Sequence, residues 1–207
     1  MVRVKVKICG ITNLDDALAA VEMGADILGF NFYPKSPRYV EEQEFTNIVS
    51  KLPTFVDIAG VFVNEDIARI RNIVNDGFLH WVQVHGDESL DYCEALKSLN
   101  VRTIKAVRVR SAMDIMYSMR FSTDAILFDA YNSKLYGGTG ETFDWNLMSN
   151  IDRRVFLAGG INPDNAKEAV EQGTYGIDVC SGIESEPGKK DHAKMKQLFY
   201  NIRDYVR

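Results

Sequence analysis

The sequence predicts an α/β protein, a (β/α)₈ TIM barrel formed by a single domain over residues 1–207. Strand-like and helix-like stretches alternate along the whole chain, and eight such pairs recur at roughly 25 residues each, the repeat of a (β/α)₈ barrel. A strict alternation of strands and helices requires a parallel sheet. No change in composition marks a linker or a second domain, so we expect the eight units to close into one barrel.

The first unit shows both patterns clearly. Aliphatic residues alternate with polar ones over residues 4–9, which is typical of a half-buried strand, and Gly10 ends it. Thr12 or Asn13 can then cap a helix over residues 14–23. Two aspartates in the first turn of this helix favour the helix dipole.

The other seven units follow the same patterns, with runs of apolar residues for strands and apolar residues three or four positions apart for helices. The further strands are expected at residues 26–32, 57–63, 81–85, 102–107, 125–129, 154–158 and 176–179. The further helices are expected at residues 41–51, 65–75, 89–99, 112–119, 145–148, 163–172 and 192–205. A glycine-rich segment at residues 136–145 is either a lid that excludes water or an ordinary surface loop.

The composition narrows the class of protein and its partners. A hydrophobic content of 46% and a charged content of 26% are ordinary for a soluble globular protein. The net charge of −5 argues against nucleic acid or an anionic membrane as the main partner, and no apolar run approaches the roughly 20 residues of a membrane span. The chain starts directly with a charged strand, so we expect no signal peptide.

The three cysteines include no closely spaced pair. This pattern favours a reducing, cytoplasmic location over a disulfide framework or a metal site.

The alternation of side chains along each strand predicts where polar side chains meet. Alternate residues of a barrel strand face the lumen or the surrounding helices. If the aliphatic residues face the helices, polar residues near the carboxyl ends of the first, fourth, sixth and eighth strands face the lumen. These residues are Cys9, Gln83, His85, Asp129, Asp178 and Cys180. The carboxyl ends of the strands form the face on which TIM barrels place their active sites.

Cys9 and Asp129 are the candidate catalytic pair. A thiol and a carboxyl group across the barrel mouth are suited to moving two protons. Taken singly, each has a simpler explanation, because a buried cysteine commonly fills a core and an aspartate at a strand end commonly caps a loop. Their joint placement at the carboxyl end favours the catalytic interpretation.

Two glycine-bearing loops predict a phosphate site. Gly159 and Gly160 follow the seventh strand, and Ser181 and Gly182 follow the eighth. Barrels often bind phosphate at these two positions, where glycine lets backbone N–H groups approach the ligand closely. The alternative is that both loops are only tight turns.

A proline-stiffened loop after the second strand presents Lys35 and Arg38. Arg38 can hold a carboxylate with two parallel hydrogen bonds. The spacing by itself favours a solvated basic loop.

Taken together, these residues resemble the phosphoribosylanthranilate isomerase family. The matching stretches span nearly the whole chain in order, and as a set they are highly specific. They are KICGIT at residues 7–12, GF at 29–30, SPRY at 36–39, GVFVN at 60–64, VQVHG at 82–86, Asp129 with YGGTG at 136–140, FDW at 143–145, AGGINPDN at 158–165, DV at 178–179, SGIE at 181–184 and PGKKD at 187–191.

The resemblance implies a cofactor-free isomerase of tryptophan biosynthesis, with no metal. The family converts N-(5-phosphoribosyl)anthranilate to 1-(2-carboxyphenylamino)-1-deoxyribulose 5-phosphate by an Amadori rearrangement. Asp129 would then be the general acid that protonates the furanose ring oxygen, and the Cys9 thiolate the general base that takes the proton from C2′. We infer that Lys7 and the loops of the eighth strand lower the pKa of this thiol.

The resemblance also implies the residues that bind substrate. Arg38 would hold the anthranilate carboxylate, His85 and Asp178 would line the site, and the two glycine-bearing loops would hold the phosphate. We therefore expect a small-molecule substrate, no nucleic-acid or membrane partner, and a monomer or homodimer.

Other functions are possible on the same fold. The aldose–ketose isomerase of histidine biosynthesis, including forms that serve both pathways, has an aspartate in place of the first-strand cysteine, so Cys9 argues against it. Indole-glycerol-phosphate synthase needs a set of lysine and glutamate residues that is not assembled here. A non-catalytic sugar-phosphate-binding barrel would be indicated by loss of Cys9 or Asp129, and both are present.

The chain departs from the family at Cys180, where serine is common. The first and eighth strands are neighbours in a closed barrel, so we predict that Cys9 and Cys180 can form an inactivating disulfide under oxidant. Such a bond requires Cα atoms within about 7 Å of each other.

Overall fold

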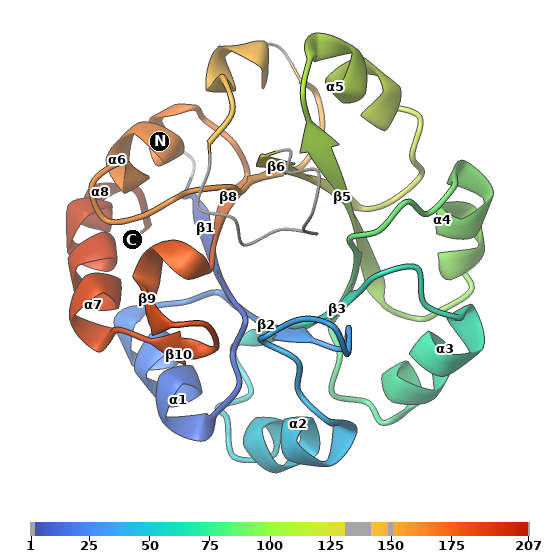
Figure 1. Ribbon diagram of the computed structural model, residues 1–207, viewed down its shortest axis with the longest axis horizontal. Helices are drawn as coiled ribbons and strands as arrows, with labels where there is room; N and C mark the ends of the chain where they lie inside the picture. Colours follow the sequence, from blue (N-terminus) through green and yellow to red (C-terminus); the bar gives the residue numbers. More distant parts are fainter. Residues whose placement is uncertain (1–2, 131–141, 149–150, 207) are drawn as a thin grey trace.

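The computed structural model describes residues 3–130, 142–148 and 151–206. Eight parallel strands follow one another around a closed barrel, with β1 paired to β2 on one side and to β8 on the other. The helices lie outside this ring (Figure 1). The predicted (β/α)₈ fold is confirmed.

The barrel strands lie close to their predicted positions. They are β1 (Lys5–Cys9), β2 (Ile27–Asn31), β3 (Asp57–Phe62), β4 (Trp81–Val84), β5 (Arg102–Val109), β6 (Ala125–Ala130), β7 (Val155–Leu157) and β8 (Gly176–Val179). The helices are α1 (Leu14–Met23), α2 (Glu42–Val49), α3 (Ile67–Asn75), α4 (Leu90–Leu96), α5 (Ala112–Ser118), the 3₁₀ helix η1 (Trp145–Met148), α6 (Ala166–Glu171), α7 (His192–Asn201) and α8 (Arg203–Val206).

The first unit folds as its sequence predicts. The side chain of Asn13 caps α1 by accepting a hydrogen bond from the backbone N–H of Asp16 at 2.8 Å. Gly24 ends the helix with a φ of 107°, a left-handed conformation that glycine adopts without strain. α1 therefore begins directly behind the loop that leaves the carboxyl end of β1.

The predicted alternation of side chains is also confirmed. One apolar cluster fills the lumen, and a second packs the outer faces of the strands, which carry Val6, Ile8, Val82 and Phe128, against the helices. The lumen cluster consists of Ile27, Ala59, Trp81, Ile104, Ala106, Ala125, Leu127, Phe156 and Ala158. Because this cluster closes the lumen, the polar lumen residues are confined to the carboxyl end of the barrel.

Two helical predictions need correction. The helix expected from residue 163 begins at Ala166, because the side-chain amides of Asn162 and Asn165 donate to the Gly160 carbonyl and hold the preceding residues in a turn. The single helix expected over residues 192–205 is divided at Ile202 into α7 and α8. The short helix expected at residues 145–148 is present as the 3₁₀ helix η1. Most of the candidate lid, residues 136–141, lies outside the described residues.

One element was not predicted. After β8, the 3₁₀ helix η2 (Ser181–Ile183) leads into an antiparallel pair, β9 (Glu184–Glu186) and β10 (Lys189–Lys190). Figure 1 shows this hairpin beside α1 and the end of β1. The Thr12 hydroxyl donates to the Gly188 carbonyl, which ties the hairpin to the loop after β1.

None of the helices in the described part of the chain has the length and apolarity that a membrane crossing requires.

Candidate active site

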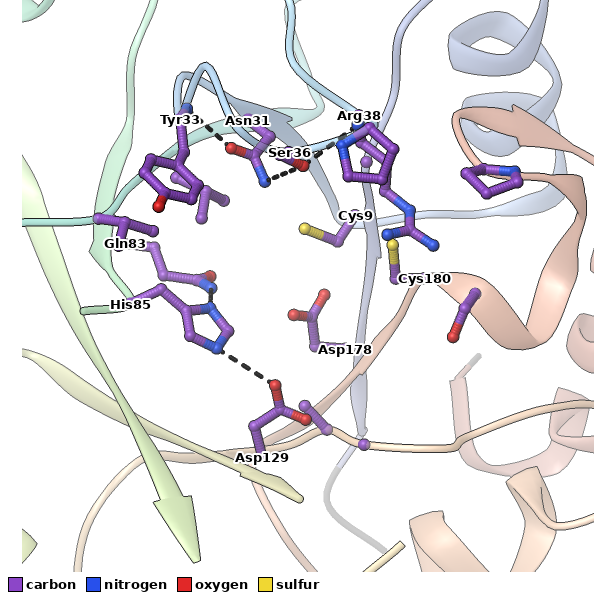
Figure 2. Close-up of a pocket in the computed structure, with 18 of the residues that line it drawn as sticks. Cys9, Asn31, Tyr33, Ser36, Arg38, Gln83, His85, Asp129, Asp178 and Cys180 are labelled. Atoms are coloured by element: carbon purple, nitrogen blue, oxygen red, sulfur yellow. Dashed lines mark hydrogen bonds and ion pairs between the residues drawn. The ribbon is translucent and has the colours of Figure 1, made fainter. Parts of the chain in front are cut away.

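A cavity of about 270 Å³ opens at the carboxyl ends of the strands. Figure 2 shows Gln83 and His85 on one side of it and Cys9 and Cys180 on the other. The predicted site residues that line the cavity are Cys9, Arg38, His85, Asp129, Gly159, Gly160, Asp178 and Ser181. The structure thus gathers eight of the nine predicted residues around one space.

Cys9 ends β1 and lies directly above the Lys7 side chain. Their position depends on Gly29, which pairs with Cys9 across β1 and β2. A Cβ atom on Gly29 would lie 2.8 Å from the Cys9 sulfur and 3.0 Å from Lys7 Nζ. Only glycine leaves room at this position for a thiol and an ammonium group to share one corner of the lumen.

Lys7 is fully buried, and its Nζ lies 2.9 Å from Oδ1 of Asp178. Burial lowers the pKa of Lys7, but the charges of Asp178 and Cys9 raise it more, so the side chain remains an ammonium. Burial raises the pKa of Asp178 to about 7, against the opposing charge of Lys7. The centre of the barrel therefore holds a positive charge directly below the half-buried thiol.

The surroundings of Cys9 favour its thiolate. The hydrogen bond from the Cys180 thiol contributes most, and the charges of Lys7 and Lys190 add to it. These effects outweigh burial and hold the pKa of Cys9 well below its usual range. The same contact and burial raise the pKa of Cys180, which keeps its proton. A thiolate at the mouth of a barrel can act as a base at neutral pH.

Asp129 faces the cavity from β6 in a buried position. Its Oδ2 lies 3.2 Å from Nε2 of His85, and its Oδ1 accepts the backbone N–H of Ala130 at 2.9 Å. Gly159 makes this placement possible, because a Cβ atom there would lie 2.6 Å from the Ala130 nitrogen and 3.0 Å from Asp129 Oδ1. The carboxyl group is thus held at both oxygens.

Arg38 is not part of a solvated loop. Its Nε and Nη2 form a bidentate ion pair with Glu184, with Nη2 2.6 Å from Oε2, and only 11% of its side chain is exposed. The hydrogen bond with Glu184 raises the pKa of Arg38 further. Nη1 makes no hydrogen bond to the residues that the structure describes. The guanidinium therefore lines the cavity with one edge fixed and one edge available.

Lys190 joins the hairpin to the carboxyl end of β1. Its buried Nζ donates to the Cys9 carbonyl at 2.6 Å and to Glu184 at 2.9 Å. Neither Glu184 nor Lys190 was predicted as a site residue. The only sequence signal for them is their place in the SGIE and PGKKD stretches that follow the eighth strand.

The two glycine-bearing loops meet at one edge of the cavity. Gly159 and Gly160 have φ values of 85° and 65°, which favour glycine. Gly182 packs against the Ile161 carbonyl, where a Cβ atom would overlap the oxygen, and it does not line the cavity. Its observed role is to let the loop after β8 lie directly on the loop after β7.

Among the described residues, no group of three or more His, Cys, Asp or Glu side chains is arranged to hold a metal ion.

The model of the N-(5′-phosphoribosyl)anthranilate (PRA) isomerase family matches residues 6–201. N-(5′-phosphoribosyl)anthranilate isomerase of Trichlorobacter lovleyi is 43% identical over 205 residues, which cover 97% of this chain and 98% of that protein. The protein of the same name from Geobacter metallireducens is 46% identical over 198 residues, which cover 94% and 96%.

Solved structures agree with these sequence matches. The crystal structure of phosphoribosyl anthranilate isomerase from Thermotoga maritima superposes with a TM-score of 0.90 at 40% identity, covering 97% of this chain and 99% of that one. A phosphoribosyl anthranilate isomerase in complex with reduced 1-(o-carboxyphenylamino)-1-deoxyribulose 5-phosphate gives a TM-score of 0.87 at 39% identity, with the same coverage.

Proposed function

The chain belongs to the N-(5′-phosphoribosyl)anthranilate isomerase family, and we propose that Cys9 and Asp129 carry its reaction as general base and general acid. The function predicted from the sequence, the isomerisation of phosphoribosylanthranilate in tryptophan biosynthesis, is confirmed by this membership. The observation that supports the two roles is the placement of a thiol with a lowered pKa and a carboxyl group around one cavity.

The chemistry of the cavity matches the two ends of the substrate. The free Nη1 edge of Arg38, together with the second N–H of Nη2, can bind the anthranilate carboxylate with two parallel hydrogen bonds. The loops of Gly159, Gly160 and Ser181 form the edge that would receive the phosphate. A substrate held at both ends would place its ribose near Cys9 and Asp129.

The proposed reaction begins with ring opening. Asp129 donates its proton to the furanose ring oxygen, the bond between this oxygen and C1′ breaks, and the nitrogen lone pair forms a Schiff base with C1′. Asp129 is left as a carboxylate, which accepts from the backbone N–H of Ala130. Hydrogen bonds to a charge that develops during the reaction lower the barrier.

Proton abstraction follows. The Cys9 thiolate takes the proton from C2′, and the released electron pair forms the C1′–C2′ double bond of an enolamine. The enolamine then tautomerises to the product ketone. Lys7 stabilises the thiolate before this step, so the base is ready when the Schiff base forms.

The roles are tested by following anthranilate fluorescence while the phosphoribosylated substrate is consumed. We expect Cys9→Ala and Asp129→Ala each to lower kcat by about 10²-fold or more, the usual contribution of a positioned acid or base. Cys93→Ala is the matched control, because burial raises the pKa of the Cys93 thiol to about 11 and the residue lies outside the cavity. Wild-type rates for both site variants would refute the assignment of roles.

We further propose that residues 1–207 form one domain that works in the cytoplasm as a monomer or homodimer on a small-molecule substrate, without nucleic acid or membrane. The net charge of −5 supports the absence of nucleic acid, and three free cysteines support a reducing compartment. One of the solved relatives, from Thermotoga maritima, is described as a dimeric isomerase from which monomers were generated.

A further inference from the structure

Gln83 is a buried amide that the reaction as written above does not use. It faces the lumen from β4, directly above the apolar cluster that contains Trp81, and it has no solvent exposure. Its Nε2 lies 3.0 Å from Nδ1 of His85, and its Oε1 has no hydrogen-bond partner among the described residues. Burying an amide with only one partner is unfavourable, so packing does not account for a glutamine at this position.

The contact with Gln83 determines which nitrogen of His85 carries the proton. An amide nitrogen can only donate, so Nδ1 of His85 must be the acceptor and must lack a hydrogen. In a neutral imidazole the proton then resides on Nε2. This nitrogen is the one that lies 3.2 Å from Oδ2 of Asp129. Figure 2 shows the three side chains in one continuous line along the wall of the cavity.

We propose that Gln83 is a positioning residue, which fixes His85 in the Nε2–H tautomer so that the imidazole donates a hydrogen bond to Asp129. The proposal rests on the proposed function of Asp129 as general acid. The proton of Asp129 goes to the ring oxygen of the substrate, and His85 keeps its own proton throughout. The hydrogen bond from His85 strengthens as Asp129 becomes a carboxylate, so it stabilises the transition state more than the ground state.

The other tautomer would oppose this step. With its proton on Nδ1, His85 would turn an unshared electron pair of Nε2 toward Asp129. That pair repels the negative charge that forms when Asp129 gives up its proton. Gln83 therefore affects the rate of ring opening without touching the substrate, and substitutions at this position should change kcat more than KM.

Two substitutions separate this role from packing. Gln83→Met keeps the length and removes the donor, whereas Gln83→Glu keeps the length and replaces the donor with an acceptor that draws a proton onto Nδ1. Thermal unfolding of each variant shows whether it is folded. Gln43→Met, in an exposed position on α2, controls for the substitution itself.

The decisive measurement is the ¹⁵N NMR spectrum of the histidine side chains, recorded above the pKa of imidazole, about 6.5. The chain has three histidines. His80 is an internal reference, because its Nδ1 accepts the backbone N–H of Ile58 at 3.0 Å and its proton is therefore on Nε2. The His85 signals are assigned by their loss in His85→Asn.

We expect His85 to show the His80 pattern in the wild type and a protonated Nδ1 in Gln83→Glu. We expect kcat to fall about 10-fold in Gln83→Met and about 100-fold in Gln83→Glu, the range typical of residues that orient a catalytic group, with little change in KM. A wild-type His85 protonated on Nδ1, or equal kcat for the two variants, overturns the proposal. The NMR result does not depend on activity, so it stands apart from the outcome for Asp129→Ala.

Discussion

Lys7 and Asp178 lie 171 positions apart in the chain but form an ion pair of 2.9 Å at the centre of the barrel. They occupy matching positions on β1 and β8, the first and last strands of the ring. Neither side chain has appreciable contact with solvent. The pair therefore acts on Cys9, two residues further along β1, without the screening that weakens surface charges.

Replacing Lys7 is expected to make Cys9 a weaker acid. In Lys7→Met the thiolate loses a nearby positive charge, so we expect the pKa of Cys9 to rise. Because the proposed base is the thiolate, we expect the low-pH limb of kcat/KM to move to higher pH as well. The ultraviolet absorbance of the thiolate during a pH titration measures the change directly, because Cys93 and Cys180 both have raised pKa values.

Lys5→Met is the matched control for this prediction. Lys5 lies on the same strand and the same side as Lys7, but its ammonium pairs with Asp26 at the opposite end of the barrel and is partly exposed. We expect no change in the titration of Cys9 in this variant. An unchanged titration in Lys7→Met as well would contradict the role given to Lys7.

Oxidation is expected to inactivate the protein through Cys9 and Cys180. Cys180 is the group that lowers the pKa of Cys9 most, and a Cβ atom on Gly10, the residue after Cys9, would lie only 2.9 Å from the Cys180 sulfur. Diamide would take two electrons from the Cys9 thiolate and the Cys180 thiol as the sulfur–sulfur bond forms, together with the Cys180 proton and one proton from solvent. We expect dithiothreitol to restore activity, and Cys180→Ser to lose activity roughly tenfold more slowly than the wild type.

Cys93→Ala controls for oxidation elsewhere and should be inactivated as fast as the wild type. Peptide mass mapping identifies the bond by a peptide that joins the segments of Cys9 and Cys180. Equal inactivation of the wild type and Cys180→Ser would contradict the prediction.

Glu184 is expected to support substrate binding through Arg38. In Glu184→Gln the guanidinium loses its charged partner and one of its fixed hydrogen bonds, so Arg38 no longer presents a fixed edge to the substrate. We expect KM to rise about tenfold, since hydrogen bonds between charged groups contribute about 1.5–3 kcal/mol, while kcat stays near the wild-type value.

Glu186→Gln removes the same charge from the same strand at an exposed position, and it should leave both constants unchanged. A fall in kcat without a change in KM in Glu184→Gln would indicate that Glu184 acts on Cys9 through Lys190 instead.

A buried ion pair away from the cavity is expected to govern stability. Lys105 donates to Glu88 and to the Gly86 carbonyl, each at 2.7 Å, and both charged side chains are buried. Lys105→Met leaves a buried carboxylate without its partner, so we expect the free energy of unfolding in urea to fall by about 3–5 kcal/mol. Lys97→Met breaks only an exposed pair with Glu94 and should change it by less than about 1 kcal/mol.

The sequence predicts the barrel and the positions of the candidate catalytic pair for simple geometric reasons. Side chains alternate with a period of two, and parallel strands end at one face, so the parity of Cys9, His85 and Asp129 follows once the strands are recognised. The start of α6 was predicted three residues too early, because the side chains of Asn162 and Asn165 compete for a backbone group that a helix would otherwise use.

The partners of the site residues could not be predicted in the same way. Arg38 pairs with Glu184, which lies 146 positions away on a hairpin too short to show a strand pattern. The contact between Gln83 and His85 is local, but its meaning depends on Asp129 from another strand. Such pairings depend on how the loops fold over the barrel mouth, and the conformation of the loops is not indicated by any periodic pattern in the sequence.

The pairing of β1 with β8 also determines when, during folding, the thiol of Cys9 becomes reactive. Cys9 precedes Cys180 and Lys190 along the chain, so it emerges before them during synthesis. Until β8 docks, Cys9 lacks the neighbouring Cys180 thiol and Lys190 charge that lower its pKa. The Cys9 thiol is therefore not activated while the chain is being synthesised. It becomes reactive when β8 docks and closes the barrel.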